Sequence, residues 1–225
     1  MAGQGFRWAG DMNGHKNPII REYLIPTATA IEKGEPVDFT QGTGVIVLAG
    51  PTDFDDPISG VANETHDGST SGRDSGTVIE LSISPTAIYK YKAAKTYTMT
   101  GGSTSTAVDS SLVPQTDNFW INGAIKIISC AADSTLNGRV VRISDSTGST
   151  GSLALAETLP SALASGDTYQ LCPGNYADGY LGYDLDSDAM NPDFDAIGGN
   201  VLRLLYSDPD NMTMYFVFER HANVS

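Results

Sequence analysis

The stretch Thr77–Ser84, TVIELSIS, shows the clearest structural pattern in the chain. Successive side chains of a β-strand point to opposite faces, so residues two apart share a face. Ile79, Leu81 and Ile83 therefore lie on one side, and the other side is largely polar. This alternation predicts a strand with one buried and one solvent-exposed face.

Similar short patterns continue on both sides of this stretch, separated by Gly, Ser, Thr, Asp and Asn. The 24 glycines among 225 residues and a charged fraction of 18% also favour strands and turns over helices. The sequence thus predicts an all-β fold. The further strands expected are 22–26, 37–40, 45–49, 58–62, 88–91, 108–112, 120–130, 139–144, 152–156, 201–206 and 213–219, and Leu159–Leu163 is expected to form one helical turn.

The strands between residues 97 and 172 form a set that looks complete by itself. We therefore expect an inserted β-module at 96–173, folded as a small barrel or sandwich. The flanking segments 23–95 and 174–225 are expected to form one β-barrel or β-tulip-like base domain, closed by a C-terminal hairpin. Residues 1–22 have no sustained period and are expected to form an extended N-terminal arm.

The arm contains apolar residues that are unusual in a disordered tail, which is the alternative interpretation. Phe6, Trp8, Ile19 and Ile20 are therefore candidate contacts to a partner subunit.

Net charge excludes one class of partner. A formal charge of -14 and a pI near 4.3 argue against nucleic-acid binding, because a polyanion would be repelled.

No apolar run approaches the roughly 18 residues that span a bilayer, so no membrane partner is expected. The N-terminus lacks a basic segment followed by an apolar core, and synthesis in a cytoplasm is the default expectation.

The two cysteines, Cys130 and Cys172, do not form a disulfide framework. A single bridge between them is possible, but buried free thiols are favoured because cysteine commonly acts as a small apolar residue.

Two resemblances arise from short, glycine-containing motifs. The segments Ile25–Val37 (IPTATAIEKGEPV) and Pro57–Thr65 (PISGVANET) resemble the opening of tailed-phage head decoration, or capsid cement, proteins. The segments Asp117–Gly123 (DNFWING) and Ala164–Tyr169 (ASGDTY) are similar to a β-module of phage virion proteins. Together the resemblances cover most of residues 23–172, and neither family has a catalytic motif.

The first resemblance implies a structural protein of the virion, made in the host cytoplasm. It would lie on the outer surface of the capsid and bridge subunits of the major capsid protein. It implies a homotrimer, with a dimer as the alternative. A second hypothesis is a virion or cell-surface adhesin that binds host glycans through the inserted module.

Catalysis and cofactors are not expected. The three histidines, His15, His66 and His221, are scattered and show no metal-binding spacing. No Gly-x-Ser-x-Gly motif stands at a strand-to-helix transition. A carbohydrate-active enzyme would need a convergent pair of carboxylates, which sequence alone does not test.

Two groups of residues have more than one plausible role. Asp184, Asp186, Asp188 and Asp195 have oxygen ligands at spacings that suit Ca²⁺, but Pro192 interrupts the pattern and a solvated acidic loop is favoured. The second group consists of aromatic residues that could belong to the core or to a subunit interface. Together with Phe119 or Trp120, they could instead form a platform on which a sugar stacks. This group comprises Tyr176, Tyr180 and Tyr183.

Overall fold

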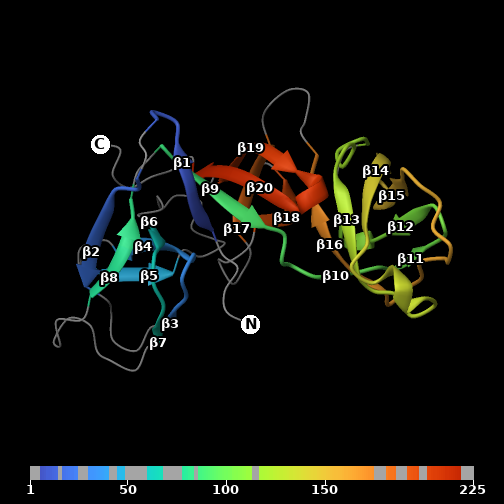
Figure 1. The fold of residues 1–225 in the computed structure, drawn as a ribbon, viewed down its shortest axis with the longest axis horizontal. Coiled ribbons are helices and arrows are strands. Elements are labelled where there is room, and N and C mark those ends of the chain that lie inside the picture. The colour runs from blue at the N-terminus through green and yellow to red at the C-terminus, as the bar shows by residue number, and fades with distance from the viewer. Residues whose placement is uncertain are drawn as a thin grey trace. The chain divides into compact units, whose positions relative to one another are not determined.

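The computed structural model describes most of the chain and divides it into two compact units (Figure 1). Unit 1 comprises Met1–Lys92, Gly182–Leu204 and Tyr215–Ser225, and unit 2 comprises Ala93–Leu181 and Leu205–Met214. All regular elements in the described residues are β-strands or short 3-10 turns, which confirms the all-β prediction. The described residues are 6–14, 17–24, 30–40, 45–48, 60–67, 78–83, 86–112, 117–174, 181–185, 192–197 and 202–218.

Unit 1 contains a five-stranded antiparallel sheet. Its outermost strands, β2 and β5, also approach each other, so the sheet curls. A separate pair, β3 (Ala30–Ile31) and β7 (His66–Asp67), lies in the same unit. In order across the five-stranded sheet, the strands are β2 (Ile20–Leu24), β8 (Val78–Ser82), β6 (Gly60–Ala62), β4 (Pro36–Thr40) and β5 (Val45–Leu48).

The alternation at residues 77–84 builds the core of this sheet. Ile79, Leu81 and Ile83 are buried and Glu80 is exposed, as the pattern predicts. Ser82 differs from the prediction, because it lies on the polar side of the pattern and is nevertheless buried. Its burial is compatible with its polarity because the Tyr89 hydroxyl donates to its Oγ and its carbonyl oxygen, both at 3.1 Å.

A second, six-stranded sheet contains the N-terminal and C-terminal strands. The residues at the turn between β19 and β20, including the 3-10 turn η3 (Pro209–Asn211), belong to unit 2. In order, the strands are β1 (Arg7–Asp11), β9 (Ala87–Lys92), β20 (Thr213–Phe218), β19 (Leu202–Asp208), β17 (Leu181–Leu185) and β18 (Pro192–Ile197).

The described residues of the expected N-terminal arm, 6–14 and 17–22, contain strand β1 and the start of strand β2. β1 pairs with β9, and β2 pairs with β8. Phe6 is 1% exposed and packs against Tyr91, Phe216 and Phe218, with ring centroids 5.3–5.9 Å apart. The strand partners lie far along the chain, so local periodicity could not reveal these pairings.

Unit 2 is built on a seven-stranded antiparallel sheet. Its extent differs from the expected module at 96–173, because it also includes Leu205–Met214 from the C-terminal hairpin. In order, the strands are β10 (Tyr97–Thr98), β16 (Thr168–Cys172), β13 (Ala124–Ser129), β14 (Val140–Thr147), β15 (Ser152–Leu155), β12 (Thr106–Val108) and β11 (Gly101–Gly102).

Three local predictions in unit 2 need correction. Leu159–Leu163 forms no helical turn; the Leu159 and Leu163 amides instead donate to the carbonyls of Thr104 and Ser103. The strand expected at 108–112 ends at Val108, and the 3-10 turn η1 (Ser110–Leu112) follows. The strand expected at 120–130 begins only at Ala124, since Asn122 has a left-handed backbone with φ of 63°.

The two cysteines are free thiols in the structure, and both are buried. This agrees with the favoured interpretation, in which each cysteine serves as a small apolar residue of the core.

Candidate functional site

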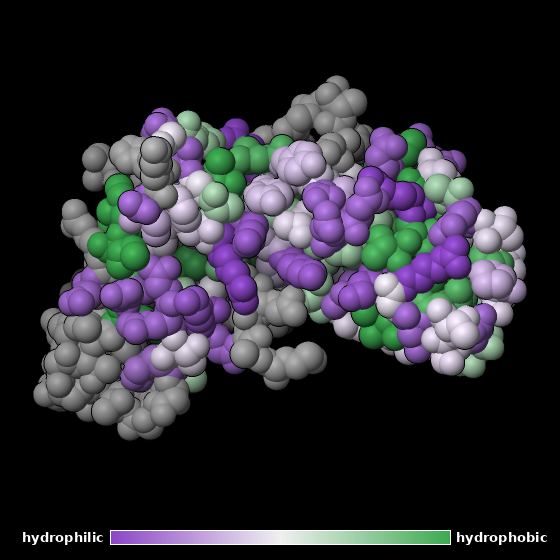
Figure 2. Space-filling model, viewed as in Figure 1, coloured by the Kyte–Doolittle hydropathy of each residue, from purple (hydrophilic) through white to green (hydrophobic). Residues whose placement is uncertain are grey.

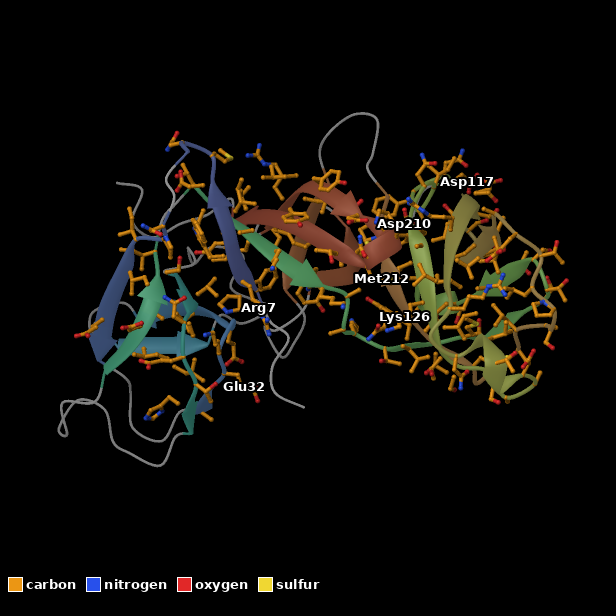
Figure 3. The ribbon with its side chains drawn as sticks, viewed as in Figure 1. Arg7, Glu32, Asp117, Lys126, Asp210 and Met212 are labelled. Carbon is orange, nitrogen blue, oxygen red and sulfur yellow. The ribbon has the colours of Figure 1, made fainter. Side chains whose placement is uncertain are left out.

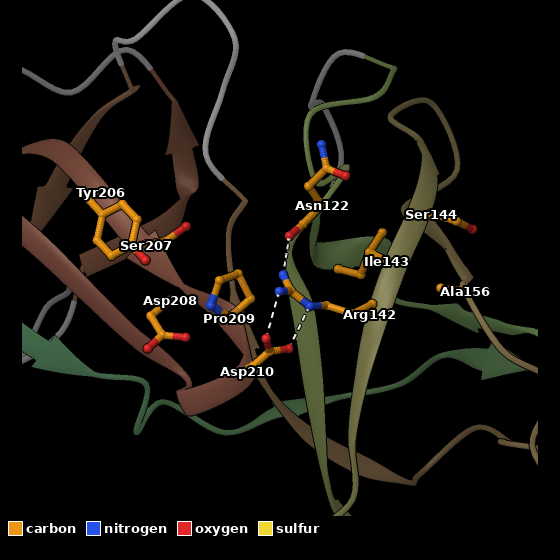
Figure 4. A pocket seen from close by; sticks show the side chains of 10 residues that line it. All are labelled: Asn122, Arg142, Ile143, Ser144, Ala156, Tyr206, Ser207, Asp208, Pro209 and Asp210. Carbon is orange, nitrogen blue, oxygen red and sulfur yellow. Dashed lines mark hydrogen bonds and ion pairs between the residues drawn. The ribbon is translucent and has the colours of Figure 1, made fainter.

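A pocket of about 700 Å³ in unit 2 lies at the turn of the β19–β20 hairpin (Figure 4). We call it the hairpin pocket. Residues from β14 form one wall, and residues from the end of β19 and from η3 form another. It is lined by Asn122, Arg142, Ile143, Ser144, Ala156, Tyr206, Ser207, Asp208, Pro209 and Asp210.

Arg142 connects the two walls of the hairpin pocket. Its Nε and Nη2 donate to the Asp210 carboxylate at 2.7 and 3.0 Å, and its Nη1 donates to the Asn122 carbonyl at 2.8 Å (Figure 4). The planar guanidinium suits this two-pronged contact with a carboxylate. Because the side chains of Arg142 and Asp210 are 42% and 69% exposed, the pair contributes at most about 1 kcal/mol.

Asp208, the second acidic residue of the hairpin pocket, is hydrogen-bonded to another residue of the β19–β20 hairpin. The Asp208 carboxylate accepts from the Asn211 amide and from Asn211 Nδ2, at 3.3 and 2.7 Å. The hydrogen bond to the backbone amide caps η3. Tyr206, by contrast, is 51% exposed on the wall of the pocket. The pocket therefore offers an accessible aromatic ring among polar groups, and both of its carboxylates are bonded to protein groups.

A smaller pocket, of about 370 Å³, lies in unit 1. We call it the β1 pocket, because three consecutive residues at the start of β1 line it. Four of its lining residues are buried hydrophobic or aromatic residues, and two others are exposed cations. The lining residues are Phe6, Arg7, Trp8, Lys33, Val61, Ala62, Asn63 and Tyr89.

The candidate contact residues near the N-terminus have different environments. Ile19 and Ile20 are 45% and 47% exposed, so they are accessible for a contact. Trp8 is partly buried and lines the β1 pocket. Phe6 belongs to the core of unit 1, where its buried ring is not accessible for the contact with a partner that the sequence suggested.

The aromatic candidates are only partly described. Tyr176 and Tyr180 lie outside the described residues, and Tyr183 is described only by its backbone position on β17, opposite Ile197. Phe119 and Trp120 are buried and stack edge to face with centroids 4.7 Å apart. This pair is core and does not form an open platform for a sugar.

Two of the four acidic candidates are described, and both lie on strands. Asp184 lies on β17, where it pairs with Asp193, and Asp195 lies on the neighbouring strand β18. Asp186 and Asp188 lie outside the described residues. Within the described part of the chain, no group of three or more His, Cys, Asp or Glu side chains is placed to hold a metal ion.

One of the three histidines lies within the described residues. His66 lies on β7 opposite Ile31, while His15 and His221 fall outside the described residues. Among the described residues, no helix is long and apolar enough to cross a membrane.

Sequence reasoning did not identify either pocket. The hairpin turn itself was recognisable from Ser207–Asn211, which has the residues of a tight turn. Nothing in the sequence relates Arg142 to Asp210, because their pairing depends on two segments 68 residues apart.

Comparison with known proteins gives no match: no protein-family model, no curated protein and no solved structure is significantly similar to this chain.

Proposed function

We propose that this chain is a structural protein that decorates the outside of a tailed-phage capsid and stabilises it by bridging capsid subunits. The observation that carries the proposal is the pairing of the two segments that resemble cement proteins. In the described parts of Ile25–Val37 and Pro57–Thr65, Pro36 pairs with Val61 and Val37 with Gly60. The two resembling segments thus belong to one structural element.

Further backbone hydrogen bonds join the same two segments. The Gly34 amide donates to the Ala62 carbonyl at 2.8 Å, and the Ala62 amide donates to the Glu35 carbonyl at 3.0 Å. Gly34 has φ of 92°, a conformation that glycine adopts without strain. The turn at Gly34 in the first motif is therefore hydrogen-bonded to the Gly-Val-Ala strand of the second motif, Gly60–Ala62.

The proposed mechanism is mechanical. A decoration protein binds the assembled shell in preference to the free capsid subunit, and so stabilises the assembled state by mass action. The chain's charge of -14 is compatible with an outer surface that does not compete for packaged DNA.

The exposed apolar residues near the N-terminus are the contacts that we assign to the capsid or to a sibling subunit. Ile19 and Ile20 adjoin each other at the start of β2, an outermost strand of the five-stranded sheet, and Met12 is 51% exposed. On the face shown in Figure 2, hydrophilic residues predominate among the described residues, with smaller hydrophobic areas between them. Interface cores bury such apolar groups within a polar rim.

The test is reconstitution of capsids that lack the protein. Purified chain is added to bare heads, and co-sedimentation and resistance of the heads to heat are measured. We expect binding and a higher disruption temperature. The paired change Ile19→Asp and Ile20→Asp should weaken binding while leaving the fold intact, and Leu205→Asp is a matched control at an exposed apolar residue of unit 2. Absence of binding, or binding without any gain in resistance, would refute the proposal.

A second candidate function is that of an adhesin that binds host glycans through unit 2, and the hairpin pocket is the feature that favours it. The half-exposed Tyr206 lines this pocket together with the polar residues Asn122 and Ser144, and sugar sites combine an aromatic face with polar groups. Glycan-array binding by the full chain that is lost in Tyr206→Ala, together with no affinity for bare heads, would select the adhesin over the decoration protein.

A further inference from the structure

The β1 pocket contains two buried hydrogen-bond donors that lack an acceptor. Trp8 and Asn63 both line this pocket, and within the described part of the structure their buried Nε1 and Nδ2 atoms have no hydrogen-bond partner. Leaving a buried donor unpaired is energetically costly, and most buried polar groups in proteins are paired. Two such donors in one pocket indicate that a ligand supplies the acceptor.

The residues that carry these donors are held in place by the fold. The Asn63 amide donates to the Glu80 carbonyl at 2.9 Å, and the Phe6 amide donates to the Gly34 carbonyl at 2.8 Å. Trp8 lies on β1, where it pairs with Tyr89 of β9. The donors therefore stand on paired backbone at both sides of the pocket, which lowers the entropy lost when a ligand binds.

Charge at the pocket favours an anion. Arg7 and Lys33 line it and are exposed, and none of the described lining residues is acidic (Figure 3 shows Arg7). The carboxylate of the nearby Glu35 accepts from the Glu32 amide at 2.7 Å. Two cations beside two N–H donors are notable in a chain whose net charge is -14. A ligand cation would be repelled, and a neutral carbonyl would leave the cationic groups unused.

The remaining walls are apolar. Phe6, Val61, Ala62 and Tyr89 are all buried, and the cavity of about 370 Å³ is near the lower end of the size of small-ligand pockets. We propose that the β1 pocket binds a carboxylate carried on a short apolar stem, with Trp8 Nε1 and Asn63 Nδ2 donating to its oxygens and Arg7 and Lys33 attracting its charge. The proposal stands independently of the capsid function, because it depends only on groups in this pocket.

A carboxylate of this kind has two sources: a free small acid, or an acidic side chain of another polypeptide. Two probes distinguish them, butyrate and the blocked peptide acetyl-Ala-Glu-Ala-amide, with butylammonium and the matching Gln peptide as charge controls. The measurement is the NMR signal of the Trp8 indole N–H. The chain has two tryptophans, Trp8 and Trp120, and the signal missing from Trp8→Phe identifies Trp8.

We expect the Trp8 indole signal to shift on titration with a carboxylate probe and to remain unchanged with both controls. Binding of butyrate indicates a free acid, and binding of the peptide alone indicates a polypeptide partner; either result supports the proposal. Asn63→Asp should weaken binding of the carboxylate by roughly tenfold or more, because the hydrogen bond from Asn63 Nδ2 is lost. The new carboxylate would also repel the carboxylate of the ligand. Lys33→Gln should weaken it less and reduce its salt dependence.

The control variant is Lys126→Gln, which removes a cation from unit 2 and should leave the affinity unchanged. Chemical-shift dispersion of each variant shows whether it is folded, and the wild-type titration tests the proposal without any variant. Three results would overturn it: no shift with either carboxylate, an equal shift with butylammonium, or undiminished affinity in a folded Asn63→Asp protein.

Discussion

The hydroxyl of Tyr169 donates to Asp109 Oδ2 at 2.9 Å, and both residues are buried in unit 2. Asp109 Oδ1 accepts from the amide and the hydroxyl of Ser111, at 2.9 and 2.8 Å. One carboxyl group thus ties β16 to the turn that follows β12, and it provides acceptors for three donors.

Removal of this carboxyl group should destabilise unit 2. In Asp109→Ala, the buried Tyr169 hydroxyl loses its acceptor, so we expect a loss of about 1–3 kcal/mol in the free energy of unfolding. Tyr169→Phe leaves both Ser111 bonds to Asp109 in place and should therefore cost less than Asp109→Ala. Urea unfolding followed by the Trp120 signal measures both. Equal effects of the two substitutions would contradict this account.

Gly151 should tolerate no side chain. It has φ of 63°, and a Cβ on it would overlap the backbone carbonyl of Asp109. Gly151→Ala should therefore destabilise unit 2 strongly. The matched control is Gly138→Ala, where φ is 86° but no atom lies within 4 Å of the added carbon. The control should cost only about 1–2 kcal/mol for the left-handed backbone. A thermal melt of each variant compares them, and the prediction fails if the control is the less stable variant.

Phe6 should be a stability determinant of unit 1. Because its ring is buried against Tyr91, Phe216 and Phe218, Phe6→Ala should lower the free energy of unfolding by about 3–5 kcal/mol. The exposed Ile19→Ala should change it by less than about 0.5 kcal/mol. Denaturation followed by the Trp8 signal tests unit 1. An unaltered transition in Phe6→Ala would restore the interpretation of residues 1–22 as an external arm.

The thiol of Cys172 should be unreactive in the native state and should make stability fall at high pH. Burial, assisted by the negative charge of Asp208, raises the pKa of this thiol from 9.0 to about 12. The native state therefore keeps the proton while the unfolded state loses it. The stabilisation is complete below about pH 9 and is lost as the pH rises from 9 to 12.

This pH effect can be isolated by substitution. In a Cys130→Ala background, Cys172 is the only remaining thiol. Its reaction with an aromatic disulfide reagent at pH 8 should be slow until denaturant is added. Cys172→Val should show a smaller loss of stability between pH 9 and 12 than the parent protein. Rapid labelling of the folded parent would contradict the burial of this thiol.

The Arg142–Asp210 pair should order the hairpin turn without contributing much to global stability. Asp210 and Met212 lie at this turn (Figure 3). Asp210→Asn should change the unfolding free energy by less than about 1 kcal/mol, because the pair is solvent-exposed. Hydrogen exchange at the Met212 amide, which donates to the Pro209 carbonyl, should become faster. Glu157→Gln breaks the exposed pair with Arg139 and should leave that exchange rate unchanged.

The strand β1 within the expected N-terminal arm is an element that local sequence patterns did not predict. Arg7–Asp11 carries no alternation of apolar and polar residues, and its strand character depends on pairing with β9, about 80 residues away. Leu159 and Leu163 have helical spacing, yet their amides bind the loop at Ser103 and Thr104. In both segments the backbone conformation is set by tertiary hydrogen bonds and not by local propensity.

The sequence by itself determined the all-β class and the main strands, because side-chain alternation and turn residues act locally. The alternating pattern predicted the strand β8, Val78–Ser82, with Ile79 and Leu81 buried, and the C-terminal pattern predicted β20, Thr213–Phe218. The tertiary structure alone decided which strands pair, that Phe6 is core, and that Trp8 and Asn63 meet in one pocket. Those outcomes depend on contacts between residues distant in the sequence, and such contacts are fixed only when apolar faces are buried together.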